Sequence, residues 1–301
     1  MKRRGRPVVY AFVCWLACVG PAPAFEVETA QGRVSIASAP QRVAAFDIAA
    51  IDTLQRLGVT LAGVPKKLFI AELETATAGV EKVGTLFEPD LEALNALSPD
   101  LIIVGGRSSP RAASTARVAR TIDMTMTGDD LIADARARLA AYGALFEKSA
   151  EAQAVAAEFD AAIAAARAAI AGKGNGLILM TNGPKISAYG PGSRFGWLHT
   201  ALGLPPAVDV AAAVHGEAVS FEFVAKANPD WLIVVDRAAA IGSGEQNARA
   251  TLDNELVAGV TAWRKGQVVY LPAADFYLAA GGVQATTRVL AALTDAFSQA
   301  R

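Results

Sequence analysis

The sequence predicts an α/β protein of two Rossmann-like lobes, with sheets rich in parallel strands, joined by one long α-helix with a ligand cleft between the lobes. Three observations lead to this prediction. The segment Pro99–Arg107 recurs 130 residues later as Pro229–Arg237, with five of nine positions identical. Each copy is a short apolar run after a turn dipeptide, which is typical of a buried parallel strand. Strand and helix signals alternate around both copies, and an alanine-rich stretch separates them.

Strand and helix signals recur along both halves of the chain, and the second half restarts the pattern of the first. In the N-terminal lobe, residues 25–146, they are strands at Arg42–Phe46, Val83–Gly84 and Leu101–Val104, and helices at Asp52–Leu57, Leu91–Leu97 and Leu131–Phe146. In the C-terminal lobe, residues 173–301, they are strands at Leu177–Met180, Ile186–Tyr189, Pro229–Val235 and Val268–Leu271, and helices at Trp197–Leu202 and Val283–Phe297. We interpret this recurrence as a pseudo-symmetric duplication.

The stretch from Glu147 to Ala171 contains neither proline nor glycine and is dominated by alanine. It predicts a helix about 38 Å long at 1.5 Å per residue, and we assign residues 147–172 to a linker helix. A single helix of that length would permit only modest motion between lobes. An ordinary surface helix of one large domain is the alternative.

The N-terminus predicts export. Four cations in the first six residues precede an apolar stretch, Val8–Val19, and a small-x-small site ending at Ala24. We therefore expect a signal peptide over 1–24, cleaved after about Ala24, and a periplasmic mature protein. Cys14 and Cys18 both lie in this leader, so the mature chain would contain no disulfide or thiolate site. A lipid anchor at Cys18 is the weaker alternative, because Trp15 fits that motif poorly.

Composition narrows the class of partner. The chain is 53% hydrophobic and 19% charged, and without its leader it has 24 basic and 29 acidic residues, a net charge of about −5. Nucleic acid is not expected as a partner at this charge. We expect a soluble, folded monomer.

Three arginines are candidate ligand-binding residues. Arg107 and Arg237 each end one copy of the repeat, and Arg194 lies in the glycine-rich segment Tyr189–Gly196. Ligands of open α/β sheets bind beyond the carboxyl ends of the strands. Two similar lobes would thus direct guanidinium groups, which are permanently charged planar donors, at whatever lies between them. The alternative is that each arginine pairs with a neighbouring acid.

Other residues suit iron chemistry or docking. His215 lies in a loop-like stretch and could ligate a metal, and Tyr277 precedes a glycine pair and could supply a phenolate, a hard donor for Fe(III). Either could instead be a packing residue, as we expect for His199. Glu88 and Glu222 precede the two copies of the repeat and could dock on a basic membrane partner, or could simply cap helices.

The alternative from a different functional class is that the protein is an enzyme rather than a binding protein. Gly190, Gly192 and Gly196 resemble a dinucleotide-binding loop, which would predict nicotinamide binding, but their spacing departs from G-x-G-x-x-G. No nucleophile elbow, zinc-protease helix or phosphate loop is present. We therefore expect no enzymatic activity and no permanently bound cofactor.

Four segments together resemble the periplasmic siderophore-binding proteins of ABC importers, over nearly all of the mature chain. They are Arg42–Asp47 with Asp52–Leu54, Gly84–Pro89, Tyr189–Gly196 and Trp263–Gly266. The likeness is to the catecholate branch, the enterobactin- and petrobactin-type binders.

The resemblance implies that the chain captures a ferric catecholate siderophore in the cleft and delivers it to an inner-membrane ABC permease and its ATPase. It implies that Arg107, Arg194 and Arg237 neutralise the complex. It also implies that His215 and Tyr277 ligate iron when the siderophore is tetradentate, and that Glu88 and Glu222 engage permease arginines. A carrier of haem, cobalamin or a hydroxamate siderophore is the nearest alternative.

Overall fold

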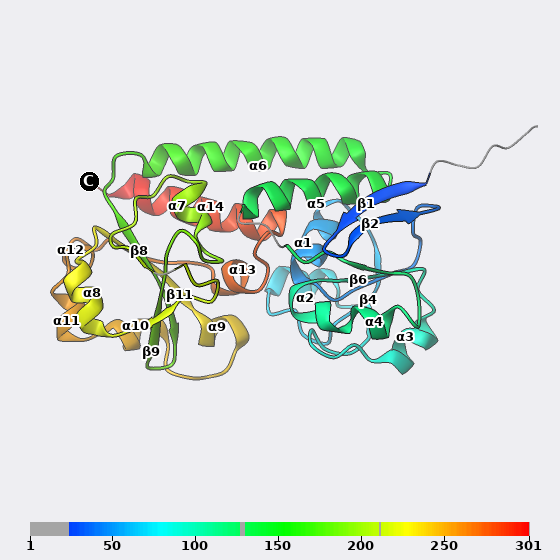
Figure 1. Cartoon of the computed structure of the whole chain (residues 1–301), viewed down its shortest axis with the longest axis horizontal. Coiled ribbons are helices and arrows are strands. Elements are labelled where there is room, and N and C mark those ends of the chain that lie inside the picture. The colour runs from blue at the N-terminus through cyan, green and yellow to red at the C-terminus, as the bar shows by residue number, and fades with distance from the viewer. Residues whose placement is uncertain (1–23, 127–129, 211, 301) are drawn as a thin grey trace, which may run out of the picture.

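The computed structural model describes residues 24–126, 130–210 and 212–300. They form two lobes, with long helices lying along one edge of both (Figure 1). The predicted leader lies outside the described residues, except for Ala24. Within these ranges, no helix has the length and apolar character needed to cross a membrane.

The N-terminal lobe is built on a five-stranded parallel sheet of order β5-β4-β3-β6-β7. Its strands are β3 (Val43–Ala45), β4 (Leu61–Val64), β5 (Glu81–Lys82), β6 (Leu101–Val104) and β7 (Thr121–Asp123). A separate antiparallel hairpin of β1 (Phe25–Thr29) and β2 (Gly32–Ile36) precedes it. Every residue of β3 and β6 is buried, as expected for central strands covered on both faces.

The C-terminal lobe has a sheet of corresponding order, β10-β9-β8-β11-β12, but it is mixed. Its strands are β8 (Gly176–Asn182), β9 (Lys185–Tyr189), β10 (Glu217–Val219), β11 (Trp231–Asp236) and β12 (Val268–Tyr270). Strands β9 and β10 are antiparallel to their neighbours. Only Gly183 and Pro184 join β8 to β9, a hairpin connection too short for a parallel crossover. The copies of the sequence repeat form β6 and β11, which hold the same place in their sheets.

The aspartate near the start of each copy of the repeat has a structural role. The Asp100 carboxylate accepts hydrogen bonds from the backbone N–H groups of Gln41 (2.7 Å) and Arg42 (3.0 Å), just before β3. The Asp230 carboxylate accepts one from the N–H of Asn175 (3.0 Å), just before β8. Each aspartate therefore ties the start of the repeat strand to the start of its neighbour.

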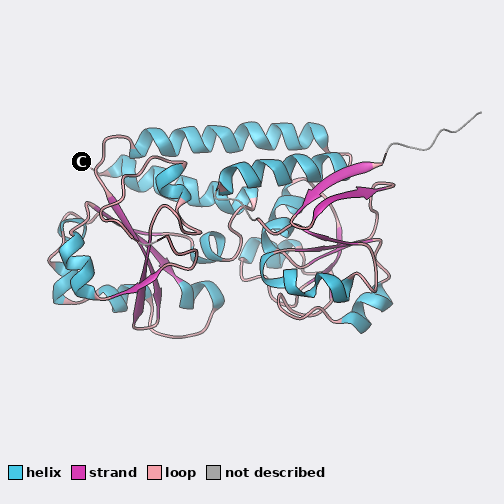
Figure 2. Cartoon of the chain, viewed as in Figure 1, coloured by secondary structure: helices cyan, strands magenta, loops and turns pink. Residues whose placement is uncertain are grey.

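Helices flank the sheets (Figure 2). In the N-terminal half they are α1 (Ile48–Arg56), α2 (Ala71–Ala76), α3 (Leu91–Leu97), η1 (Gly106–Arg111, a 3₁₀-helix), α4 (Ala112–Thr115), α5 (Leu131–Leu145) and α6 (Ser149–Ile170). In the C-terminal half they are α7 (Trp197–Thr200), α8 (Phe221–Ala227), α9 (Arg237–Ile241), α10 (Ala248–Leu252), α11 (Glu255–Ala258), α12 (Thr261–Arg264), α13 (Ala273–Tyr277) and α14 (Val283–Gln299).

The long alanine-rich helix is not the only link between the lobes. Helix α6 buries Val155 in the core of the N-terminal lobe and Phe159 in the core of the C-terminal lobe. Helix α14 does the same with Val283 and Leu290, and these two helices run side by side (Figure 1). The predicted two-lobed α/β class is confirmed, while the domain boundaries stay predictions.

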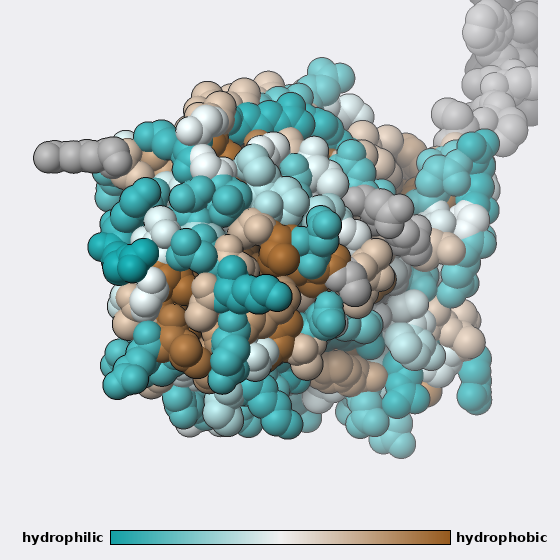
Figure 3. Space-filling view, turned by 60° about the vertical axis from the view of Figure 1, so that its left-hand side comes forward, coloured by the Kyte–Doolittle hydropathy of each residue, from teal (hydrophilic) through white to brown (hydrophobic). Residues whose placement is uncertain are grey.

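The face shown in Figure 3 carries many hydrophilic side chains, with hydrophobic residues gathered in places between them. Over the described residues, the large apolar side chains classed as exposed are Phe87, Val214 and Leu256.

Candidate ligand-binding cleft

A cavity of about 610 Å³ lies between the lobes, in the size range of small-molecule sites. Both lobes line it. The N-terminal half of the chain contributes Phe46, Asp47, Ile48, Leu86, Gly105, Gly106, Arg107, Thr125, Met126, Leu131 and Arg138, and the C-terminal half contributes Pro191, Gly192, Ser193, Arg194, Trp197, Val214, His215, Tyr277, Leu278 and Ala280.

Arg107 reaches the cleft from η1, directly after the buried strand β6. A hydrogen-bonded network fixes this turn. The Asp123 carboxylate at the end of β7 accepts hydrogen bonds from the hydroxyl groups of Ser109 (2.5 Å) and Thr125 (2.6 Å). The Thr125 hydroxyl oxygen in turn accepts one from the Gly106 N–H (2.8 Å). The network therefore orients the segment that carries Arg107.

Arg194 reaches the cleft from the tight loop between β9 and α7. A Cβ atom at Gly196 would lie 1.9 Å from the carbonyl oxygen of Pro191, so the loop requires glycine there. Behind the loop, Phe195 stacks on Phe276 with ring centroids 4.5 Å apart, and the Arg194 guanidinium carbon lies 5.0 Å from the Phe195 ring centroid. Aromatic packing thus holds the arginine in place.

Arg237 is the first residue of α9, directly after β11. Its Nη1 donates to the Asn182 side-chain oxygen (2.7 Å), and its Nε donates to the Tyr277 hydroxyl (3.2 Å). It is half-buried and is absent from the residues that line the cavity. Arg237 therefore contacts the Tyr277 hydroxyl without itself lining the cavity.

The three arginines converge on Tyr277. Arg194 Nη2 and Arg107 Nη2 donate to its backbone carbonyl oxygen, at 2.9 and 3.3 Å. Their guanidinium carbons lie 4.9 and 5.0 Å from its ring centroid, and that of Arg237 lies 6.0 Å away. The cluster joins residues separated by 170, 83 and 40 positions in the chain.

The cluster carries positive charge without an acidic partner. Within the described residues, none of these three arginines forms an ion pair with a carboxylate. A fourth cleft arginine, Arg138 on α5, differs, because its buried guanidinium pairs with the Asp47 carboxylate. Guanidinium groups without a carboxylate partner would suit a negatively charged ligand in this cleft.

The pKa shifts reflect this crowding. Burial lowers the pKa of Arg194, and the charge of Arg107 lowers it further. Burial raises the pKa of Tyr277, but the hydrogen bond from Arg237 and the charges of Arg107 and Arg237 oppose this, so the net pKa is below the usual value for tyrosine. The surrounding positive charges thus stabilise the phenolate form of Tyr277 relative to that of an ordinary tyrosine.

His215 also lines the cavity, in an exposed turn before β10. His199 is 8% exposed, and its Nδ1 lies 2.7 Å from the Leu204 carbonyl oxygen. This buried contact indicates a structural role for His199. In the part of the chain that the structure describes, no group of three or more His, Cys, Asp or Glu side chains could hold a metal ion.

The predicted docking acids occupy different positions. Glu222 is the second residue of α8, whereas Glu88 lies before α3 and faces the exposed Arg111 guanidinium at 3.4 Å. Helices α3 and α8 match closely: each has seven residues and a left-handed C-cap, and each is followed by Pro-Asp and a buried strand. By this match the counterpart of Glu222 is Glu92, which sequence reasoning missed although both precede the aspartate by eight residues.

The glycine-rich loop at Gly190–Gly196 is not flanked by the secondary structure of a dinucleotide-binding site. It follows β9, which is antiparallel to its neighbours, and leads into α7, which has only four residues. A dinucleotide loop joins a parallel strand to a helix whose N-terminus holds the pyrophosphate. The geometry therefore does not support the nucleotide-binding alternative.

Two α/β lobes with an arginine-lined cleft between them are typical of a solute-binding protein of the periplasmic type. The chain belongs to the periplasmic binding protein family, whose model matches residues 43–274.

Individual relatives agree with this assignment. The petrobactin-binding protein YclQ of Bacillus subtilis is 34% identical over 261 residues, covering 85% of this chain and 82% of YclQ. Its crystal structure superposes with a TM-score of 0.85 over 92% of this chain and 100% of YclQ. The ferric-anguibactin-binding protein FatB of Vibrio anguillarum is 30% identical over 85% of this chain and 82% of FatB. The periplasmic catecholate-siderophore binding protein VctP of Vibrio cholerae is 27% identical, with a TM-score of 0.83 over 90% of this chain and 99% of VctP.

Proposed function

We propose that this protein is a non-enzymatic periplasmic carrier that captures a ferric catecholate siderophore and delivers it to an ABC importer. The observation that carries the proposal is the convergence of Arg107, Arg194 and Arg237 without a carboxylate partner. Buried or half-buried like charges repel one another and are costly unless an anion joins them. A ferric catecholate complex supplies that negative charge.

The names of the relatives support this ligand class. YclQ is named for petrobactin and VctP for catecholate siderophores. Catecholate oxygens are hard donors that retain net negative charge when they bind Fe(III), so guanidinium groups suit the outer face of the complex. The apolar walls formed by Phe46, Leu86 and Trp197 would pack against the catechol rings.

Tyr277 and His215 are the proposed protein ligands to iron when a siderophore supplies only four oxygens. Both line the cavity. The lowered pKa of Tyr277 favours the phenolate that Fe(III) prefers. His215 is exposed in its turn, so it can approach a bound complex without first breaking a buried contact. A hexadentate siderophore would need neither residue.

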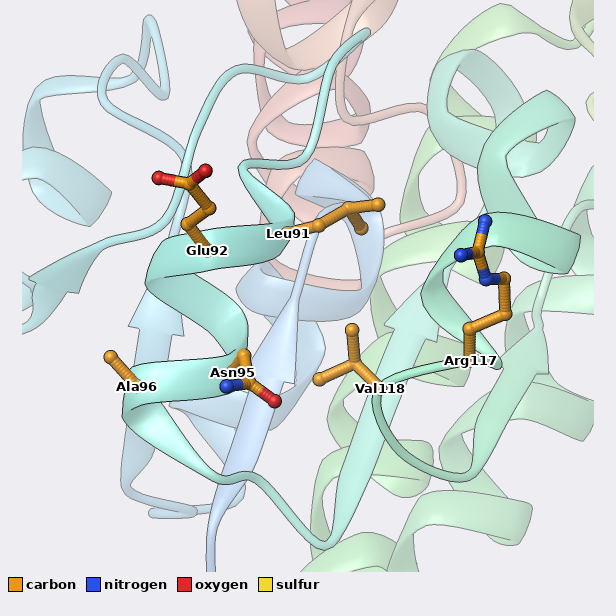
Figure 4. Close-up of a pocket in the computed structure, with 6 residues that line it drawn as sticks. All are labelled: Leu91, Glu92, Asn95, Ala96, Arg117 and Val118. Carbon is orange, nitrogen blue, oxygen red and sulfur yellow. The ribbon is translucent and has the colours of Figure 1, made fainter.

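We assign docking on the permease, which delivery of the siderophore requires, to one exposed acid on each lobe. Glu222 and Glu92 hold equivalent positions in α8 and α3. Glu92 projects from the first turn of α3 at the rim of a surface groove, with its carboxylate directed away from Val118 (Figure 4). We propose that Glu222 and Glu92 engage basic residues of the permease, with Glu88 as a neighbouring contact. Such exposed charges contribute more to encounter and orientation than to affinity.

The test is a binding panel on the mature protein. Trp197 lines the cavity, so bound ferric complex should quench its fluorescence. We expect tight quenching by ferric bis- and tris-catecholates and weak quenching by a ferric hydroxamate, haemin and NADH. Tight binding of haemin or NADH together with no binding of catecholates would refute the proposal.

A further inference from the structure

Helix α14 begins against the other lobe. The Gln284 and Ala285 N–H groups donate to the Asp52 carboxylate of α1, at 2.8 and 3.1 Å, and the Val283 N–H donates to the Thr53 hydroxyl at 3.3 Å. The first N–H groups of a helix have no partner within it. Side chains of α1 thus cap a helix that ends in the core of the C-terminal lobe.

The contact between these helices leaves no room for a side chain at Gly282. A Cβ atom there would lie 2.7 Å from Asp52 Oδ2. Asp52 itself is 0% exposed, so it could not move aside into solvent. The junction between the lobes is therefore closely packed.

Arg288 extends this junction to α13. Its Nε and Nη2 donate to the two carboxylate oxygens of Asp275, at 2.8 and 2.7 Å. The same Nη2 lies 3.4 Å from Asp52 Oδ1. Asp275 is 7% exposed, and buried carboxylates of this kind need a cation nearby. One guanidinium thus holds together α1, α13 and α14.

Helix α13 also carries the centre of the arginine cluster. Asp275 precedes Tyr277 by two residues, and Tyr277 ends the helix. The following residues, Leu278 and Ala279, are buried in the core of the N-terminal lobe. The position of the Tyr277 carbonyl, the shared acceptor of Arg107 and Arg194, thus depends on how α13 is held.

We propose that Arg288 is a positioning residue for the binding site, which sets the place of Tyr277 by clamping Asp275 of α13 to Asp52 of α1. Arg288 itself is absent from the cavity lining, so it acts through Tyr277. Loss of the clamp would let α13 shift and would separate Tyr277 from the guanidinium groups around it. As far as ligand affinity is concerned, this inference rests on the proposed function.

Two readouts on the full mature chain test the clamp. The first is the ionisation of Tyr277, followed by tyrosinate absorbance against pH, with Tyr277→Phe in each background to isolate its signal. We expect Arg288→Gln to raise the pKa of Tyr277 toward its ordinary value. The second is the affinity for a ferric bis-catecholate, which should fall about tenfold, or about 1.4 kcal/mol.

A matched control is available in Arg136→Gln. Arg136 pairs with Asp160 at 2.6 Å on the exposed faces of α5 and α6, so this variant also loses an ion pair between helices. It should change neither readout. A lower Tm for Arg288→Gln with unchanged Tyr277 ionisation and affinity would overturn the proposal, because the clamp would then be only structural.

A third variant covers the case in which Arg288→Gln does not fold. Arg288→Lys keeps the charge but loses the two-point attachment, and it should shift both readouts in the same direction by less. No shift in this variant would overturn the proposal. The ionisation of Tyr277 needs no ligand, so it decides the question even if the wild type binds no catecholate and the proposed function fails.

Discussion

Replacing Arg194 by glutamine separates the charge of the arginine cluster from its structural role. Arg194 is the member of the cluster for which burial and the charge of Arg107 both lower the pKa. Both effects disfavour the charged form of Arg194, and a bound anion would favour it. Arg194→Gln should weaken binding of a ferric catecholate while leaving the fold intact.

The size of the effect follows from the geometry. The Arg194 guanidinium carbon lies 4.9 Å from the Tyr277 ring centroid, and an anion bound against that side chain would lie at about this separation. Two unit charges about 5 Å apart attract by about 3 kcal/mol at an effective dielectric constant of about 20. Partial exposure reduces this to about 2 kcal/mol, which corresponds to about a 30-fold loss of affinity.

The assay is a titration of Trp197 fluorescence, combined with thermal unfolding of the free protein. The lost hydrogen bond to the Tyr277 carbonyl and the relieved repulsion from Arg107 act in opposite directions, so Tm should change by less than about 3 °C. Arg136→Gln, which removes an exposed paired arginine, should leave the affinity unchanged.

Two results would refute this reasoning. Unchanged affinity in Arg194→Gln would mean that the guanidinium does not neutralise the ligand. A loss of affinity that Arg136→Gln reproduces would mean that the assay reports general destabilisation rather than charge in the cleft.

Three further predictions concern iron ligation, docking and pH. Tyr277→Phe should weaken binding of a tetradentate complex more than that of a hexadentate one and shift the charge-transfer band; equal losses would argue against direct ligation. Glu92→Ala with Glu222→Ala should leave affinity intact but reduce uptake in cells, and more than Glu88→Ala with Glu222→Ala does; normal uptake would remove the docking role. Burial raises the pKa of Asp52 to about 6 from 3.8, so the native state binds a proton more tightly than the unfolded chain does. The stability from this group is thus fully present below about pH 4 and is lost as pH rises through about 6, by up to about 3 kcal/mol. Asp52→Asn should flatten this part of the unfolding free energy against pH, and an unchanged profile would contradict the assignment.

The sequence alone determined the two-lobed α/β class, because the signals that define it are local. The apolar runs after Pro99 and Pro229 predict buried strands, and the alanine-rich stretch predicts the helix observed as α6 at Ser149–Ile170. The arginines that end the repeated strands were also evident, since ligands gather at the carboxyl ends of such strands.

Tertiary structure decided which groups meet. Arg107 and Tyr277 are 170 residues apart, and no local pattern indicates that a backbone carbonyl would serve as acceptor for two arginines. Likewise, Asp47 forms its ion pair with Arg138 rather than with Arg107 or Arg194, and this pairing depends on the packing of α5 on the sheet. The antiparallel strands β9 and β10 arise from a short turn whose effect on strand direction appears only in the folded sheet.

The difference between local and long-range signals also explains why only one of the two helices that connect the lobes was predicted. The sequence predicted one connecting helix, because a long run without proline or glycine is a local sequence pattern. That α14 also crosses between the lobes, capped by Asp52 some 230 residues earlier, depends on the path of the whole chain. Periodicity fixes which face of a helix is apolar, whereas contacts between distant segments are selected by close packing and by the need of buried polar groups for partners.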